Sequence, residues 1–346
     1  MSRSLFRRLG VIFSIFPLLV LAGCSGASGN SAQSASGSVD ISKVTLNVAD
    51  IQWKEDEALL KAAGLSDTKY KVNVQVFDGG NNSIQAVNSG KVDVTRTSEI
   101  PPVFAASQQG AGNLTIPALL NDGITGADQG VLVAPGSAIK TITDLKGKKV
   151  GYVEGTTAQY FLYKFLQSNG LGWGDIQAEK LSPADGATAL LNGNIDAFAG
   201  FGGGVNAAVA KGATYLAQGS DVLPAYYPYV APKATLADAT KRAALFDYLG
   251  RLSAAYSWVA QHPDDWAKTS AQPNGATVEA RTATIKAGVA KVKTQVVAPS
   301  DQITQGAQDV ANVFQQVGLL KGQVDAATLF DSQYSAELAS AIKQYA

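Results

Sequence analysis

The chain has only one cysteine and one histidine among its 346 residues. One cysteine cannot form an intramolecular disulfide, and the sequence lacks the cysteine and histidine clusters that hold zinc or build a Cys–His nucleophile. The histidine, His262, precedes Pro263 between two predicted helices, so we expect a surface residue at a helix end rather than a general base. The composition therefore predicts no enzyme active site, no metal site and no cofactor.

An excess of charge of one sign is also lacking, because 28 Lys and Arg side chains balance 28 Asp and Glu side chains. Removal of residues 1–23, which hold three arginines and no acidic residue, would leave a formal charge of −3. A mildly acidic chain has no general attraction for nucleic acid or for an anionic lipid surface. We therefore expect no nucleic-acid partner.

Long apolar runs are lacking too, apart from residues 11–21. Three arginines precede this run, which is too short to span a bilayer comfortably, and a bacterial lipobox, LAGC, follows at residues 21–24. This order predicts a signal peptide over residues 1–23 and a lipid on Cys24; the alternative is a chance cysteine after a short apolar segment. Residues 24–40 are mostly small and polar and predict a flexible tether. We expect an exported protein held by its lipid at the outer face of the bacterial cytoplasmic membrane.

The rest of the chain alternates between strand-like and helix-like segments, and from Asp238 onward it is almost entirely helix-like. This order predicts an α/β fold with two lobes, each a mixed, mostly parallel sheet flanked by helices. We expect residues 41–131 and 230–346 to form the first lobe and residues 132–229 the second. Strands are predicted at residues 44–48, 70–77, 92–94, 130–134, 150–153, 178–181, 195–198 and 214–216, and residues 226–230 are expected to be the return segment.

One short stretch, residues 150–160, combines the features of an anion site. A buried strand ends before Gly155, two hydroxyl residues follow, and an apolar helix begins near Tyr160 and stops at Asn169. Free backbone N–H groups and the positive end of the helix dipole favour an anion at such a helix start. The alternative is an ordinary turn with a capped helix.

Ligands of open α/β sheets bind beyond the carboxyl ends of the strands, so the loops after the predicted strands are the candidate site. Small polar residues or an aromatic recur in these loops in both lobes, which favours a cleft between the lobes. The candidate ligand-binding residues are Gln52, Trp53, Gly80, Asn81, Ser98, Glu99, Gly155, Thr156, Thr157, Ala158, Phe201 and Gly202.

Several of the neighbouring residues allow two interpretations. Asp50, Asp78 and Glu99 could bind a hard cation, although their loops are not spaced like a calcium loop. Arg96 either clamps an anion or pairs with Glu99. Trp53 either stacks on an apolar ligand tail or caps its lobe. The run of three glycines at residues 202–204 lacks the lysine of a P-loop and predicts a tight turn.

A set of short motifs in a fixed order carries a family resemblance. The chain resembles the aliphatic sulfonate, taurine and nitrate family of ABC-transporter substrate-binding proteins. The motifs are GKVDV at 90–94, SEIPPVF at 98–104, DLKGKKV at 144–150, GTTAQY at 155–160, SPAD at 182–185, GNIDAF at 193–198 and VAQHP at 259–263.

The resemblance implies a type II periplasmic-binding-protein-like fold, whose two lobes close on a small ligand. It also implies that the protein is a monomer and that it delivers the ligand to a membrane permease with its ATPase. Relatives usually carry Gly-Ser-Ser-Ala at residues 155–158, where the anionic head group binds, and threonine keeps the hydroxyl. Two departures alter the expected pocket wall: residues 201–203 are Phe-Gly-Gly where relatives often have Trp-Asp-Pro, and Ser98 replaces a usual glycine.

Together these features predict a lipid-anchored solute-binding protein for a small organosulfonate or a similar anion. The alternatives are a receptor for nitrate, bicarbonate or a thiamine or pyrimidine precursor, an enzyme on the same fold, and a structural surface lipoprotein.

Overall fold

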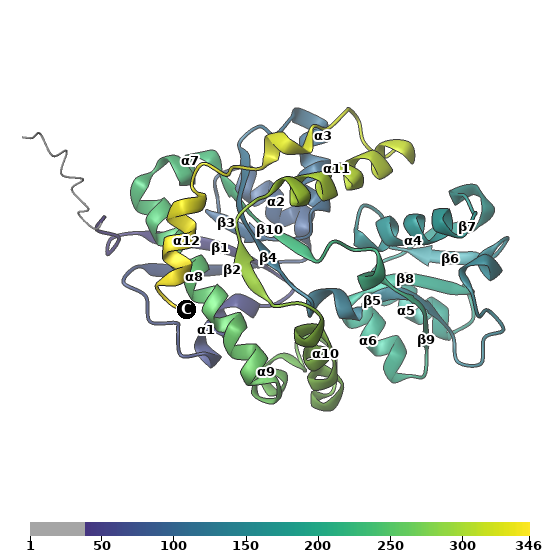
Figure 1. The fold of residues 1–346 in the computed structure, drawn as a ribbon. Coiled ribbons are helices and arrows are strands. Elements are labelled where there is room, and N and C mark those ends of the chain that lie inside the picture. Colours follow the sequence, from purple (N-terminus) through teal and green to yellow (C-terminus); the bar gives the residue numbers. More distant parts are fainter. Residues whose placement is uncertain (1–38) are drawn as a thin grey trace, which may run out of the picture. The chain divides into compact units, whose positions relative to one another are not determined.

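The computed structural model describes residues 39–346, which form one compact unit. The predicted signal peptide, Cys24 and nearly all of the predicted tether lie outside these described residues. Within the unit, two mixed sheets are flanked by helices (Figure 1). The α/β class with two mixed sheets is confirmed.

The first sheet has six strands in the order β11-β4-β10-β3-β1-β2. β1 pairs in parallel with β2 and with β3, whereas β10 runs antiparallel to β3 and β4, and β11 runs antiparallel to β4. The strand bounds are Thr45–Ile51 (β1), Lys71–Phe77 (β2), Val94–Arg96 (β3), Leu114–Asn121 (β4), Tyr226–Pro232 (β10) and Gln295–Val297 (β11).

The second sheet has five strands in the order β7-β6-β8-β5-β9. β6 is parallel to β7 and β8, and β5 is antiparallel to β8 and β9. Four of the nine pairings among the described strands are parallel, so the expectation of mostly parallel sheets is wrong. The strand bounds are Gln129–Val133 (β5), Lys149–Tyr152 (β6), Gln177–Lys180 (β7), Ala197–Phe201 (β8) and Thr214–Gln218 (β9).

Helices cover both faces of both sheets (Figure 1). The α-helices are Glu55–Ala62 (α1), Gly80–Asn88 (α2), Ile100–Gln109 (α3), Thr157–Ser168 (α4), Pro183–Leu191 (α5), Gly202–Ala210 (α6), Lys233–Ala237 (α7), Ala239–Gln261 (α8), Pro263–Ser270 (α9), Val278–Lys291 (α10), Asp301–Gln316 (α11) and Ser335–Lys343 (α12). The 3-10 helices are Thr125–Asp128 (η1), Ile142–Leu145 (η2), Trp173–Asp175 (η3), Gly219–Asp221 (η4) and Ala326–Leu329 (η5).

Each sheet face has its own apolar core, because successive side chains of a strand point to opposite faces. In β10, Tyr229 packs with α1, α8 and α9, whereas Val230 packs on the other face with α2, α3 and α11. In β5, Val131 packs with α4, and Leu132 packs with α5 and α6. Four separate apolar layers therefore hold the two sheets and their helices.

Two chain segments, residues 122–128 and 219–225, connect the sheets. They lie side by side, because the backbone N–H of Asp122 donates to the carbonyl oxygen of Ala225 at 2.8 Å. The predicted lobe boundaries at 131/132 and 229/230 fall inside β5 and β10 rather than in these segments. The division into lobes stays a prediction, with its boundaries better placed at the two connections.

Three strands of the first sheet were not predicted as strands: β4, β11 and β10, which is the expected return segment. β4 carries Pro117, which has no N–H for a sheet hydrogen bond, and the pairing of β10 with β4 shifts register between Tyr229 and Ala231 beside it. β11 has three residues and lies in the segment expected to be helical. The third predicted strand, 92–94, is observed at Val94–Arg96.

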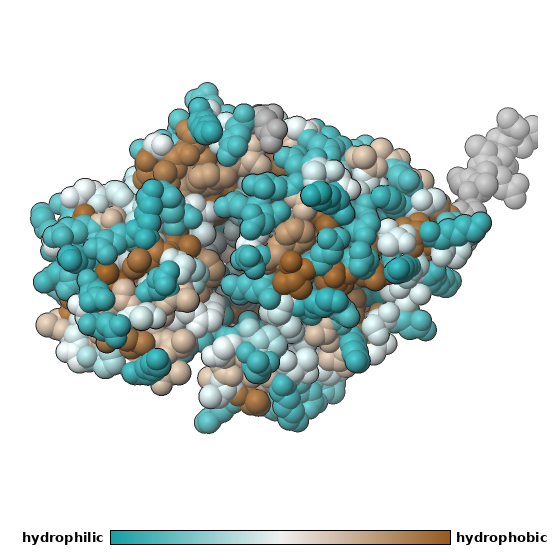
Figure 2. All heavy atoms as spheres, turned by 180° about the vertical axis from the view of Figure 1, so that it is seen from behind, coloured by the Kyte–Doolittle hydropathy of each residue, from teal (hydrophilic) through white to brown (hydrophobic). Residues whose placement is uncertain are grey.

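The surface is largely polar, and Figure 2 shows hydrophilic residues spread over one face with apolar ones between them. Large apolar side chains that are clearly exposed, such as Val76 and Val209, lie apart in the sequence. None of the helices described in residues 39–346 combines the length and the apolar character that a bilayer crossing requires.

Candidate ligand-binding pocket

A pocket of about 510 Å³ lies beyond the carboxyl ends of strands from both sheets. Its wall includes Gln52 after β1, Thr97 after β3, Val153 after β6 and Phe201 at the end of β8. The connecting segment 122–128 adds Thr125 and Asp128, and the adjoining strands β5 and β10 add Gln129 and Tyr227. The position agrees with the expectation that ligands bind where the strands of an open α/β sheet end.

Ten of the twelve predicted site residues line this pocket: Gln52, Trp53, Gly80, Asn81, Ser98, Gly155, Thr156, Thr157, Phe201 and Gly202. Glu99 and Ala158 do not. Ala158 is fully buried in the apolar layer between α4 and the second sheet, and Glu99 is buried behind the pocket at the start of α3.

Helix starts converge on the pocket from both sheets. α2 begins at Gly80 and α6 at Gly202, and neither start is capped by a side chain. Their first-turn N–H groups and their dipoles are therefore available to an anion. Gly202 has a φ of +59°, and glycines 202–204 form the first turn of α6 rather than the separate tight turn that we expected.

The start of α4 uses its hydroxyls within the protein. Thr156 is the N-cap: its hydroxyl accepts from the N–H of Ala158 at 3.2 Å and donates to the carbonyl of Val153 at 2.7 Å. Thr157 donates its hydroxyl to Oε1 of Gln129 at 2.6 Å. The capped-turn interpretation is therefore confirmed for Thr156, and the donors left for an anion here are backbone N–H groups rather than the two hydroxyls.

Four carboxylates and one guanidinium line the pocket, and only some of these charged residues were predicted from the sequence. Asp50, Glu55, Asp78 and Asp128 line it together with Arg96. Burial raises the pKa of Asp128 to about 6, against the opposing effect of Arg281. Among the described residues, no three His, Cys, Asp or Glu side chains are grouped so that they could hold a metal ion.

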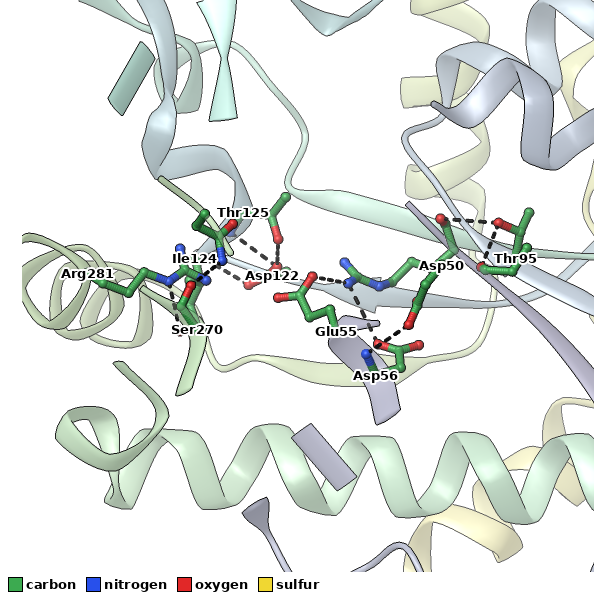
Figure 3. Close-up of polar contacts among 12 residues, drawn as sticks. Asp50, Glu55, Asp56, Thr95, Asp122, Ile124, Thr125, Ser270 and Arg281 are labelled. Atoms are coloured by element: carbon green, nitrogen blue, oxygen red, sulfur yellow. Dashed lines mark hydrogen bonds and ion pairs between the residues drawn. The ribbon is translucent and has the colours of Figure 1, made fainter. Parts of the chain in front are cut away.

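Arg96 forms ion pairs with carboxylates of α1. Its Nη2 lies 2.8 Å from Glu55 Oε2 and 3.7 Å from Asp56 Oδ1 (Figure 3). The predicted alternative of a pair with Glu99 is wrong, because β3 directs Arg96 toward α1. Glu99 lies apart from it: Oε1 of Glu99 is buried without a partner, and burial raises the pKa of Glu99 to about 7.

Trp53 lines the pocket and also stacks on Trp266 with ring centroids 6.0 Å apart, so its contact with a ligand tail stays a prediction. The preceding residue, Gln52, has a φ of +69°, a strained conformation that is typical of binding sites. His262 is a half-exposed residue between α8 and α9 that stacks on Trp258, as expected, and it does not line the pocket.

The sequence did not predict several further wall residues, among them Thr125, Asp128, Gln129, Tyr227 and Asn274. The first four lie in or next to the segments that connect the sheets, and Asn274 lies in the turn between α9 and α10. The signal available for them was their place at a lobe boundary, since ligand sites often lie between domains.

Comparison with known proteins agrees with this geometry. A family model described as NMT1/THI5 like matches residues 57–266. A protein of Escherichia coli K12 named for aliphatic sulfonate binding is 34% identical over 168 residues, which cover 47% of this chain and 51% of that protein. The aligned segment thus spans about half the length of that curated relative.

The fold is shared with solved structures of two kinds. The periplasmic aliphatic sulphonate binding protein SsuA from Escherichia coli superimposes with a TM-score of 0.74 at 24% identity, over 82% of this chain and 91% of that chain. The desulfurization enzyme DSZB superimposes with a TM-score of 0.63 at 15% identity, over 88% of this chain and all of that chain. At these identities, the likeness shows the fold alone.

Proposed function

Because the chain belongs to the NMT1/THI5-like family, we propose that it is the extracytoplasmic solute-binding component of an ABC importer. Its ligand is a small organosulfonate or a similar anion, held in the pocket between the two sheets. The partners of the ligand-loaded protein are a membrane permease and its cytoplasmic ATPase, and the protein acts as a monomer.

The observation that carries this proposal is the set of helix starts around the pocket. Uncapped N–H groups of α2 and α6, together with the first turn of α4, face one cavity from both sheets. Such donors hold an anion without a cationic side chain, each helix contributing about 0.3–1 kcal/mol through its dipole. The name of the Escherichia coli relative supports a sulfonate as the anion.

The cavity volume supports an organic ligand over a small inorganic one. A volume of about 510 Å³ lies in the range of sites for small organic molecules and exceeds what nitrate or bicarbonate needs. Trp53 and Phe201 supply an apolar surface for a carbon chain or ring. A pyrimidine precursor is the alternative ligand that fits this volume.

The segments that connect the sheets are suited to a hinge. Only residues 122–128 and 219–225 join the strands of one sheet to those of the other in the segment from β4 to β10. Small changes of dihedral angle there would open or close the pocket. Export and lipid attachment at Cys24 complete the proposal, because a receptor at the membrane surface stays near its permease.

An enzyme on the same fold is the second class, as the likeness to DSZB illustrates. Within residues 39–346 there is no cysteine, and His262 does not line the pocket, so this part of the chain supplies neither a thiol nor an imidazole to the wall.

The test is isothermal titration with a series of alkanesulfonates, with carboxylates of equal length as competitors, and mass spectrometry of the incubated ligands. Saturable binding of a sulfonate, recovered unchanged, is expected. Gly80→Ala should weaken binding, because its Cβ would lie 2.7 Å from Pro101 Cγ and push the start of α2 away. Gly174→Ala, whose Cβ meets nothing within 4 Å, is the matched control. Absence of saturable binding, or chemical conversion of the ligand, would overturn the proposal.

A further inference from the structure

A buried group of three carboxylates and one guanidinium lies behind one side of the pocket. Asp50 is 3% exposed and Asp56 1% exposed, and the backbone N–H of Asp56 donates to Asp50 Oδ2 at 3.2 Å. Arg96 contacts Glu55 and Asp56, as described above, and Figure 3 shows Asp50, Glu55 and Asp56 gathered at this place. Asp50, Glu55 and Arg96 reach the pocket wall, whereas Asp56 lies beneath it.

The charges of this group do not balance if every member is ionised. Three carboxylates share one guanidinium, and an unpaired charge buried away from water costs several kcal/mol. The other polar groups that face these carboxylates are the hydroxyls of Tyr229 on β10 and of Tyr248 and Tyr256 on α8, which carry no charge at neutral pH. The group therefore has to hold at least one proton.

Contacts decide which carboxylate holds it. Glu55 makes the short ion pair with Arg96, and Asp56 is the next carboxylate to that guanidinium. Burial raises the pKa of Asp56 to about 6, against the opposing attraction of Arg96, and its Oδ1 has no hydrogen-bond partner. Asp50 contacts no cation among the described residues. Burial, followed by the repulsion from Asp56, raises the pKa of Asp50 well above its usual value. Since Oδ2 of Asp50 accepts the N–H of Asp56, the proton belongs on Oδ1.

We propose that Asp50 is held protonated and donates its carboxyl proton to the anionic group of the ligand, so that ligand capture is coupled to proton binding. This inference rests on the proposed function. The protonation of Asp50 explains how an anion can bind in a pocket that is lined by four carboxylates and by one arginine already paired with carboxylates. A neutral carboxyl donates a hydrogen bond to the anion, whereas an ionised one would repel it.

The sign of the coupling follows from this role. An anion favours the protonated form of Asp50, so affinity is highest below the pKa of Asp50 in the free protein and falls as the pH rises through it. One linked proton lowers the affinity by up to about tenfold per pH unit above that pKa. Asp128 also lines the pocket and also has a raised pKa, with Arg281, Tyr215, Tyr227 and Glu55 around it, so its contribution has to be separated by mutation.

The experiment measures the affinity of the whole mature protein for ethanesulfonate between pH 5 and pH 9 by calorimetry, in two buffers of different ionisation enthalpy. We expect affinity to fall with rising pH and binding to take up protons from the buffer above neutral pH. Asp50→Asn should bind at all these pH values with a flat profile, because the amide donates a hydrogen bond without a titrating proton. Infrared difference spectra between the free wild-type protein and Asp50→Asn should show a protonated carboxyl band at pH 7 that comes from the wild type, since the protonated fraction of Glu99 contributes to both proteins and cancels.

Four outcomes would overturn the inference. The first is an affinity that does not depend on pH, and the second is an affinity that rises with pH, as a positively charged ligand would require. The third is a pH dependence of affinity that is lost in Asp128→Asn but kept in Asp50→Asn. The fourth is loss of binding at low pH by an Asp50→Asn protein that is folded. If the wild type binds no sulfonate yet shows the carboxyl band, the proposed function fails and the donation to the ligand fails with it, while the protonation of Asp50 stands.

Discussion

Thr157, on the first turn of α4, donates its hydroxyl to the side-chain oxygen of Gln129, the first residue of β5, at 2.6 Å. The amide nitrogen of Gln129 in turn donates to Tyr227 Oη at 3.3 Å and to the carbonyl of Thr125 at 3.2 Å. This chain of hydrogen bonds joins the start of α4 to the connecting segment 122–128 and to β10 of the first sheet. It fixes one wall of the pocket without any bound ligand.

The first prediction concerns that hydrogen bond. Thr157→Val should lower the free energy of unfolding by about 1–3 kcal/mol, because it leaves the buried oxygen of Gln129 without a donor. Thr157→Ser keeps the hydroxyl and should stay close to the wild type. Urea unfolding of the three proteins gives the comparison. A Thr157→Val protein as stable as the wild type would show that the hydrogen bond contributes nothing to stability.

Because the pKa of Glu99 is raised in the folded protein, we expect the free energy of unfolding to depend on pH. Its folded-state pKa of about 7 lies above the value of 4.5 for an exposed glutamate, so its contribution to stability is complete below pH 4.5 and is lost as the pH rises through 7. Glu99→Gln removes this loss, and at pH 8 it should be more stable than the wild type, by about 3 kcal/mol at most. At pH 4 the two proteins should be equally stable.

Thermal melts across this pH range test the expectation for Glu99. Glu179→Gln, a change at a half-exposed glutamate, is the control and should leave the pH profile unchanged. A profile of Glu99→Gln parallel to the wild type would mean that Glu99 has the same pKa in both states.

Because the backbones of Gly123 and Gly288 lie close together, we expect that a methyl group added at Gly288 lowers the stability of the protein. A Cβ on Gly288 in α10 would lie 2.7 Å from the carbonyl oxygen of Gly123 in a connecting segment, and neither backbone can move freely. Gly288→Ala should therefore cost about 1–3 kcal/mol by overpacking, despite the better helix propensity of alanine. Gly306→Ala in α11, whose Cβ has its nearest neighbour 3.9 Å away, should instead stabilise the protein. Equal effects of the two changes would refute the tight contact.

Trp53 predicts an optical signal of ligand binding. It lines the pocket, whereas Trp266 beneath it is 1% exposed. Closure on a ligand should make the surroundings of Trp53 drier and change tryptophan emission. Trp53→Phe should remove most of that change, and Trp258→Phe, on the surface of α8, should preserve it. A full signal in Trp53→Phe would place the reporter elsewhere.

The lipid on Cys24 is tested in cells. Metabolic labelling with a lipid precursor should mark the wild-type protein and not Cys24→Ala, since the cysteine thiol is the attachment point. Equal labelling of the two proteins would rule out the anchor at this residue.

Much of the local structure could be predicted from the sequence, because strands, caps and helix ends depend on neighbouring residues. The strand predicted at 150–153 is observed at Lys149–Tyr152, and the helix expected to stop at Asn169 ends at Ser168. Thr156 caps that helix through its own hydroxyl. The loops after the strands, which the sequence predicted as the ligand site, line the pocket, since the ends of strands in an α/β sheet meet at one edge.

The strands without a clear local pattern could not be predicted from the sequence. β4 is apolar on both faces and carries Pro117, so it shows neither alternation nor an uninterrupted β-branched run. It forms a strand because β10 and β11 pair with its two edges. Such pairing joins segments more than 100 residues apart and leaves no mark on the local sequence of either one.

The partners of the charged groups were decided by tertiary structure alone. Arg96 and Glu99 are three residues apart, and one of the two interpretations of Arg96 from the sequence was a pair with Glu99. In the fold, Arg96 extends from β3 toward Glu55 and Asp56 on α1, while Glu99 starts α3 on the other side of the sheet. The sequence determined that charged residues gather at the carboxyl ends of β1 and β3, because Asp50 and Arg96 lie at the ends of these strands and Glu55 and Glu99 follow shortly after them. Only the packing of α1 against the sheet decided which carboxylates share the guanidinium, and thereby left Asp50 without a cation at the pocket wall.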